Sequence, residues 1–138
     1  MESAPFAGLA DIDRLAASTT AAGVGVDVRR RGQQCPLPTA IDRSAFRIIQ
    51  EAVTNVVRHA GTSRCRVSID YLGEELRIEV VDDCGGVVEV VEGAGYGIAG
   101  MRERVALLNG HFSAGPRPEG GFRVAARLPV PPVGSAAR

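Results

Sequence analysis

Four side chains with chemical potential recur at helical spacing in the middle of the chain: Glu51, Asn55, Arg58 and His59. At 100° per residue they span roughly 100° of arc on one helix face. An amide oxygen is a hard, neutral ligand that suits Mg²⁺, and a guanidinium suits a phosphate. A carboxylate one turn away can accept a proton or hold metal-bound water. Taken alone, however, this face is more typical of a solvated helix surface with an incidental histidine.

Two glycine-containing segments follow the helix. At Asp82-Asp83-Cys84-Gly85-Gly86, two carboxylates end a predicted strand before a turn. Such a carboxylate can accept from an exocyclic amine, and glycine lets backbone approach a flat ligand, although Asp-Gly turns are common. Gly93-Ala94-Gly95-Tyr96-Gly97 stands directly before a predicted helix. The free N–H groups at such a helix start favour a phosphate, but a single Gly-x-Gly is a weak signal.

Hydrophobic periodicity predicts the elements that must position these residues. The central helix starts at Asp42 or Ser44 and continues to about Ala60, and Arg29 to Pro38 is predicted to be a loop. The core stripe of this helix is expected to contain Phe46, Ile49, Val53, Val56, Val57 and Ala60. The other expected elements are helices over 8–22 and 98–108, strands over 24–28, 65–72, 75–81 and 122–128, and a further strand near His111. The strands over 65–72 and 75–81 alternate in hydrophobicity and are expected to form a hairpin around Gly73. The last helix is expected to place Met101 and Val105 on its core stripe and to stop near Gly110.

The order of these elements predicts the fold class. Paired strands followed by helices favour an α+β two-layer sandwich over a doubly wound sheet. The glycine-rich segments do not follow a first βα turn, which disfavours a classical dinucleotide fold. Residues 1–130 are expected to form one domain, and the Pro-, Gly-, Ser- and Ala-rich tail from Pro129, with 131–138 outside the domain, is expected to fray.

Composition excludes several function classes. The chain has 138 residues, which suits one domain. Its 16 basic and 16 acidic residues cancel, which argues against a dedicated DNA- or membrane-surface binder. Every basic residue is Arg, so a Lys Schiff base and a P-loop Lys are excluded. Three widely spaced cysteines without a C-x-x-C pair indicate reduced thiols rather than a zinc site, and no segment has the length of a membrane span.

The motifs together resemble those of a known family. Residues 47–60, RIIQEAVTNVVRHA, closely resemble the N box of bacterial sensor histidine kinases. Residues 82–86 resemble their first glycine box, and 95–105, GYGIAGMRERV, closely resemble the second. The second box is similar to the subclass partnered with helix-turn-helix response regulators. The resemblance covers 9–129 and implies the Bergerat ATP-binding fold of the GHKL superfamily, a mixed, mostly antiparallel sheet with helices on one face.

The resemblance also implies a role for each matching residue. Asn55 would bind Mg²⁺, and Glu51 would support the metal-bound water or act as the acid/base group. Arg58 would contact phosphate, His59 would lie against the nucleoside, and Asp82 would accept from the adenine amino group. The glycines expected to shape the pocket and its lid are Gly86, Gly95 and Gly97. The cofactors implied are ATP and Mg²⁺.

Some features depart from the family pattern. Cys84 occupies the first glycine position of the D-x-G-x-G motif, and the predicted lid over 87–94 carries two glutamates and no basic residue. Neither His59 nor His111 lies in a long amphipathic helix pair. The chain is therefore expected to be the ATP-binding portion of a kinase, unable to autophosphorylate alone, with the dimerisation and phosphoacceptor domain absent.

The implied transferase belongs to two-component signal transduction. It would give the γ-phosphoryl group of ATP to a histidine on a dimerisation helix outside this chain, and would meet a response regulator through the parent kinase. The chain alone is expected to be a cytoplasmic monomer without nucleic-acid or membrane contact, any anchor lying in the parent kinase. Two alternatives stay open: a stand-alone module or Ser kinase of the anti-sigma-factor type, and a degenerate nucleotide-binding domain.

Overall fold

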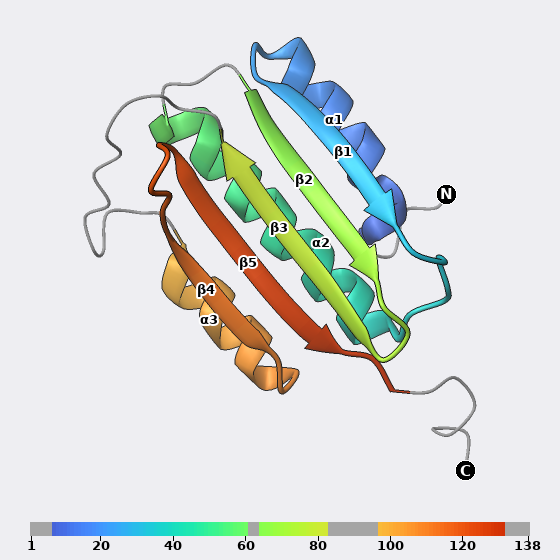
Figure 1. Ribbon diagram of the computed structural model, residues 1–138. Coiled ribbons are helices and arrows are strands. Elements are labelled where there is room, and N and C mark those ends of the chain that lie inside the picture. The colour runs from blue at the N-terminus through green and yellow to red at the C-terminus, as the bar shows by residue number, and fades with distance from the viewer. Residues whose placement is uncertain (1–6, 61–63, 83–96, 132–138) are drawn as a thin grey trace.

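A single sheet with helices on one side forms the architecture (Figure 1). The computed structural model describes residues 7–60, 64–82 and 97–131. In Figure 1 the strands stand in front, and α1, α2 and α3 lie behind them. The predicted two-layer α+β sandwich with helices on one face is therefore confirmed.

The elements follow one another as helix, strand, helix, two strands, helix and two strands. A short 3₁₀ turn, η1, precedes α1, and a π-helical turn, η2, continues α2. The bounds are η1 Leu9–Asp11, α1 Ile12–Ala21, β1 Gly25–Arg31, α2 Thr39–Asn55, η2 Val56–Ala60, β2 Arg64–Tyr71, β3 Glu75–Asp82, α3 Ile98–Leu107, β4 His111–Pro116 and β5 Phe122–Pro129.

The sheet is mixed and mostly antiparallel, as expected. Over the described residues its order is β1-β2-β3-β5-β4. Only β1 and β2 are parallel, joined through α2 as a crossover. The hairpin predicted around Gly73 joins β2 to β3, and Gly73 has a φ of +82°, which glycine adopts without steric cost.

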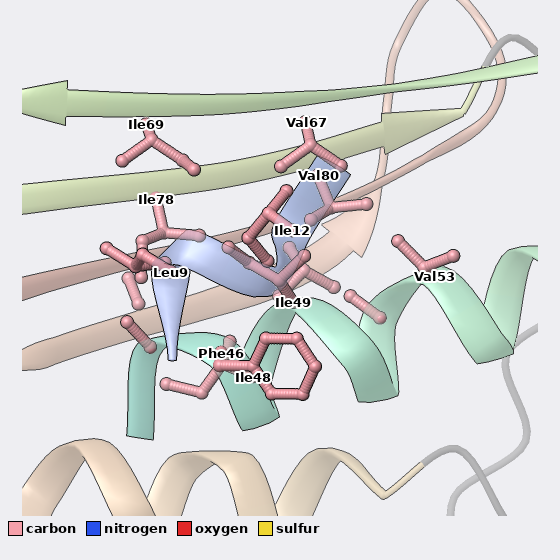
Figure 2. Close-up of a cluster of buried hydrophobic side chains, with 14 of the residues drawn as sticks. Leu9, Ile12, Phe46, Ile48, Ile49, Val53, Val67, Ile69, Ile78 and Val80 are labelled. Carbon is pink, nitrogen blue, oxygen red and sulfur yellow. The ribbon is translucent and has the colours of Figure 1, made fainter. Parts of the chain in front are cut away.

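The core lies between the helices and the inward face of the sheet. Figure 2 shows side chains of β2 and β3 pointing toward α2, with Leu9 and Ile12 from the first helical segment beside them. Because successive strand residues alternate in direction, every second residue of each strand contributes to this layer. Its fully buried members include Ile12, Ile48, Ile49, Val53, Val67, Ile69, Leu76, Ile78, Met101, Val105 and Leu128.

The start of α2 differs from the prediction. The helix begins at Thr39, directly after Pro38, and Pro38 makes no side-chain cap. Asp42, one of the two predicted caps, lies inside the first turn, where its Oδ1 accepts from the backbone N–H of Leu9 at 2.9 Å. The carboxylate therefore satisfies a donor of η1 instead of its own helix, a long-range contact that local capping rules do not contain.

The end of α2 also differs, in a way that concerns the predicted site. The α-helix stops at Asn55, and Val56–Ala60 form a π turn rather than more α-helix. A π turn bonds i to i+5, so it shifts side-chain directions from the 100° spacing. The predicted core stripe holds through Val56, but Val57 is 48% exposed, so its placement on that stripe was wrong.

The predicted loop from Arg29 is wrong in its first three residues. Arg29, Arg30 and Arg31 continue β1 and pair with β2 along their whole length. Each finds an acidic partner: Arg29 contacts Asp27, Arg30 contacts Asp13, and Arg31 contacts Asp70. Three consecutive charges are compatible with an edge strand because such partners and solvent satisfy them.

The ends of α3 and of β5 also differ from the prediction. The left-handed residue that ends α3 is Asn109, with a φ of +61°, rather than Gly110. At the carboxyl end, Pro129 closes β5, and Val130 is buried and donates its N–H to the Glu74 carbonyl at 2.8 Å. The fraying predicted from Pro129 is therefore wrong for these two residues. Among the helices described, none is long and apolar enough to cross a membrane.

Candidate functional site

Several element ends converge at one end of the sheet (Figure 1). The end of α2 with η2, the carboxyl end of β3, the start of β5 and the turn between β4 and β5 all lie there, and α3 begins on the same side. Each of the described motif residues lies in or beside one of these ends. The fold therefore brings together motifs that are far apart in the sequence.

The closest contact between motifs joins Glu51 to Gly97. Gly97 precedes α3 in the left-handed conformation, with φ of +69° and ψ of +15°. A Cβ built on Gly97 would lie 2.5 Å from Oε1 of Glu51, a separation that real Cβ atoms do not show. Glycine is favoured at this position by its positive φ, and an added Cβ would also displace the flexible Glu51 side chain.

The other predicted residues of α2 and η2 differ in their surroundings. Asn55 is the last α-helical residue and is half-buried, one turn beyond the exposed Glu51. Side chains four apart on a helix are neighbours, so Asn55 and Glu51 lie on one face as predicted. Arg58 is exposed within the π turn, and the backbone of His59 lies in the same turn. The shared arc predicted from α-helical spacing therefore holds for Glu51 and Asn55, whereas Arg58 lies in a π turn, to which the 100° spacing does not apply.

Asp82, the last residue of β3, is buried, with only 2% of its surface exposed. It lies against Gly121, which has a φ of +88°, and a Cβ on Gly121 would come within 2.8 Å of Asp82 Oδ1. Burying a carboxylate is costly unless polar partners accompany it, so the buried Asp82 is a candidate site residue. This burial matches the expected role of an acceptor inside a pocket.

Two neighbours of Asp82 were not predicted as site residues. Nη1 of Arg117 donates to the Asp82 backbone carbonyl at 3.0 Å, and Nη2 of Arg117 contacts Glu119 at 3.1 Å. Gly121 gives a signal in the sequence, since a Gly-Gly pair before a strand indicates a turn or a close approach. Arg117 gives none, because a lone arginine in a turn does not indicate its partner.

Some predicted residues cannot be placed. Gly86 and Gly95, together with Cys84 and the predicted lid over 87–94, lie outside the described residues. Their expected roles therefore stay predictions.

The described residues suit a ligand that combines Mg²⁺, phosphate groups and a ring with an amino group. Amide and carboxylate oxygens, as in Asn55 and Glu51, are hard donors that Mg²⁺ accepts while it keeps phosphate oxygens and water. The main-chain N–H groups at the start of α3, beside Gly97, form the positive end of a helix dipole. A buried carboxylate at Asp82 can accept from an amino group. The donor set fits such a ligand.

Comparison with known proteins gives the family context. A family profile described as "Histidine kinase-, DNA gyrase B-, and HSP90-like ATPase" matches residues 41–132, more than half of the chain. The chain is 29% identical over 110 residues to the signal transduction histidine-protein kinase/phosphatase DegS of Brevibacillus brevis. That alignment covers 78% of this chain and 28% of DegS, so the chain spans less than a third of this relative.

Solved structures share the fold at low identity. The histidine kinase domain of the Erythrobacter litoralis EL346 blue-light activated histidine kinase matches with a TM-score of 0.64 and 23% identity, covering 93% of this chain and 66% of that one. Full-length ShkA, solved in complex with AMPPNP, matches with a TM-score of 0.63 and 18% identity, covering 96% and 32%. Both matches extend over nearly all of the chain.

Proposed function

Because the chain belongs to the family of histidine kinase-, DNA gyrase B- and HSP90-like ATPases, we propose that it binds Mg–ATP where α2, β3 and α3 converge. It then donates the γ-phosphoryl group to a histidine on a dimerisation helix outside this chain. The observation that carries this proposal is the contact between Glu51 and Gly97, because it joins the two most specific motifs at one place.

The proposal gives each residue a task. Asn55 holds Mg²⁺, and Glu51 positions metal-bound water or accepts a proton. Arg58 binds phosphate, while His59 lies against the nucleoside. Asp82 accepts from the adenine amino group, with the pocket shaped by Gly86, Gly95 and Gly97. The metal neutralises charge on the phosphates, so catalysis is mainly positioning and electrostatic stabilisation.

The nucleotide seen in the ShkA complex supports an adenine nucleotide as the ligand here. The first experiment is calorimetric titration of the chain with ATP and ADP, with and without Mg²⁺, for the wild type and Asn55→Ala. We expect Mg²⁺ to strengthen binding and the variant to lose about tenfold or more of that Mg²⁺-dependent gain, the order expected for a charge-assisted contact. Gln50→Ala is the matched control, since it removes a second amide from the same helix.

Gln50 contacts Arg47 at the exposed surface and has no proposed contact with the ligand. Equal loss in Gln50→Ala and Asn55→Ala would contradict the assignment of Asn55. No binding of either nucleotide at millimolar concentration would contradict the proposal for this chain as a whole and would favour the degenerate alternative.

Phosphoryl transfer needs a separate test. In the presence of labelled ATP we expect the chain alone to remain unlabelled, and an added dimerisation hairpin with its histidine to become labelled. The response regulator then takes the phosphoryl group from the parent kinase rather than from this domain. Stoichiometric labelling of His59 or His111 would contradict the proposal, and labelling of a partner serine would favour the Ser-kinase alternative.

A further inference from the structure

The outward face of the sheet, opposite the helices, carries an excess of positive charge. Strand residues that alternate with the core residues point to this side, and in Figure 1 it is the face without a helix. We call it the arginine face. Its arginines are Arg29, Arg31, Arg64, Arg66, Arg77, Arg123 and Arg127, and its acidic residues are Asp27, Asp70, Glu75 and Glu79.

One row of the arginine face crosses the whole sheet. The register pairs Arg31 with Asp70, Asp70 with Arg77, Arg77 with Arg127, and Arg127 with His111. Arg77 and Arg127 are thus direct cross-strand neighbours of like charge. Such a pair is destabilising, whereas Arg31–Asp70 and Asp70–Arg77 in the same row are opposite-charge pairs that stabilise a sheet. Sheet stability therefore does not account for the placement of Arg77 beside Arg127.

The acidic residues do not balance the row, because they are shared. Glu75 contacts Arg77 at 2.6 Å and lies 4.0 Å from Arg127. Asp27 is likewise shared, at 3.3 Å from Arg29 and 3.9 Å from Arg66. The side chains of Arg77 and Arg127 remain 52% and 51% exposed, so their remaining donors face solvent.

The arginine face is also hollowed. A shallow cavity of about 480 Å³ lies over all five strands. Its charged and polar lining includes Arg31, Arg77, Arg123, Arg127, His111 and Ser113, together with the acidic Asp70 and Glu79. With strands about 4.8 Å apart, the row from Arg31 to His111 spans roughly 19 Å, the length of about six extended residues. The cavity is therefore broad enough for a short peptide segment rather than for one small ion.

We propose that the arginine face is a docking surface for a carboxylate-rich segment of a partner protein. Guanidinium groups match carboxylates in geometry and charge. A nucleic acid is the weaker fit, because its phosphates recur at fixed intervals and cannot avoid Asp27, Asp70, Glu75 and Glu79, whereas a flexible peptide can place its carboxylates between them.

The test uses the full chain and a polyglutamate peptide of about six to eight residues, matched to the length of the row. Binding is measured by calorimetry at low salt and again with added salt, which screens exposed charges. Polylysine of the same length and a single-stranded DNA oligonucleotide are the comparison ligands. We expect polyglutamate to bind, to weaken with salt, and to bind more tightly than either comparison ligand.

Variants locate the binding. Arg77→Gln with Arg127→Gln should weaken polyglutamate binding at least fivefold, and Arg31→Gln gives a second variant on another strand. The control pair, Arg14→Gln with Arg47→Gln, removes the same charge from the helical side and should change binding less than twofold. Loss of the ion pair with Glu75 and relief of the like-charge pair oppose each other, so the double replacement should change the melting temperature little.

Three results would overturn the proposal: no polyglutamate binding at low salt, equal weakening by the two double variants, or tighter binding of DNA. ATP titration of the same variants keeps this test separate from the proposed function, because the arginine face lies on the opposite side of the sheet from the helices. Unchanged ATP binding is expected in every variant.

Discussion

Replacing Gly97 by alanine tests the contact that joins the two motifs. An L-residue in the left-handed region costs about 1–2 kcal/mol of stability. Alanine offsets about 0.4–1 kcal/mol of this cost, because it restricts the unfolded chain more than glycine does. We therefore expect Gly97→Ala to lower the free energy of unfolding by about 1 kcal/mol from backbone conformation alone. The added Cβ, 2.5 Å from Glu51 Oε1, also forces that carboxylate to move.

Gly100→Ala is the matched control, because Gly100 lies inside α3 and an added Cβ there meets nothing within 4 Å. Alanine in a helix interior is favoured over glycine by about 0.5–1 kcal/mol, so this variant should be more stable than the wild type. Urea unfolding should then separate the two variants by roughly 2 kcal/mol.

A double-mutant cycle isolates the carboxylate. In the Glu51→Ala background the side-chain clash is gone, so Gly97→Ala should cost only its conformational part. The coupling is expected to stay below about 1 kcal/mol, since the end of a flexible side chain can swing away. Equal or greater stability of Gly97→Ala than of the wild type would refute the reasoning, because the left-handed conformation would then carry no cost.

Three further predictions follow from contacts described above. Gly121→Ala should lower the free energy of unfolding, measured in urea, by about 2–4 kcal/mol, which is more than Gly97→Ala. The φ of Gly121 is again positive, and the added Cβ meets the backbone of Asp82 as well as its side chain, so there is little room to adjust. A cost below that of Gly97→Ala would contradict this. The hydrogen bond from Arg77 lowers the pKa of Glu75, helped by nearby positive charge. The stability advantage over Glu75→Gln, about 0.5 kcal/mol at pH 6, should therefore diminish as the pH falls from about 4.3 through the lower folded-state pKa. An advantage that does not change as the pH is lowered would contradict this. Burial raises the pKa of Tyr71, opposed by Arg30. The wild type should therefore lose stability relative to Tyr71→Phe as the pH rises above about 10 through the raised folded-state pKa, measured by chemical unfolding at each pH; parallel curves would contradict it.

Much of the fold could be predicted because it depends on local periodicity. The alternation in β2 and β3, the turn at Gly73 and the core stripe of α3 around Met101 and Val105 are present in the structure as expected. The family resemblance is confirmed by the match over 41–132. Such local elements can be predicted from residues that are close together in the sequence.

The failures share a different cause, which is contact between distant residues. Asp42 accepts a hydrogen bond from Leu9, so the prediction that it caps the central helix is wrong. The arginines of β1 have ion-pair partners on α1 and β2, so the local sequence predicts a loop where the structure has a strand. The π turn shifts Val57 out of the core, and no single residue type in the sequence signals such a turn.

The same reasoning applies to the candidate site. The sequence motifs predict Glu51 and Asp82 as site residues. They do not indicate that Glu51 lies beside Gly97 or that Asp82 lies beside Gly121. Such proximity depends on the packing of α2 against α3 and of β3 against β5. Only three-dimensional structure supplies it.

The parallel pairing of β1 has a consequence during synthesis. Among the described strands β1 pairs with β2 alone, and paired residues such as Arg31 and Asp70 lie 39 residues apart. At translation rates of about 5–20 residues per second, β1 leaves the ribosome roughly 2–8 s before its partner. An unpaired strand is an aggregation hazard for that interval, and charged residues are the usual protection. The positive charges of residues 29–31 would thus keep nascent chains from associating with one another until β2 is synthesised and the domain folds.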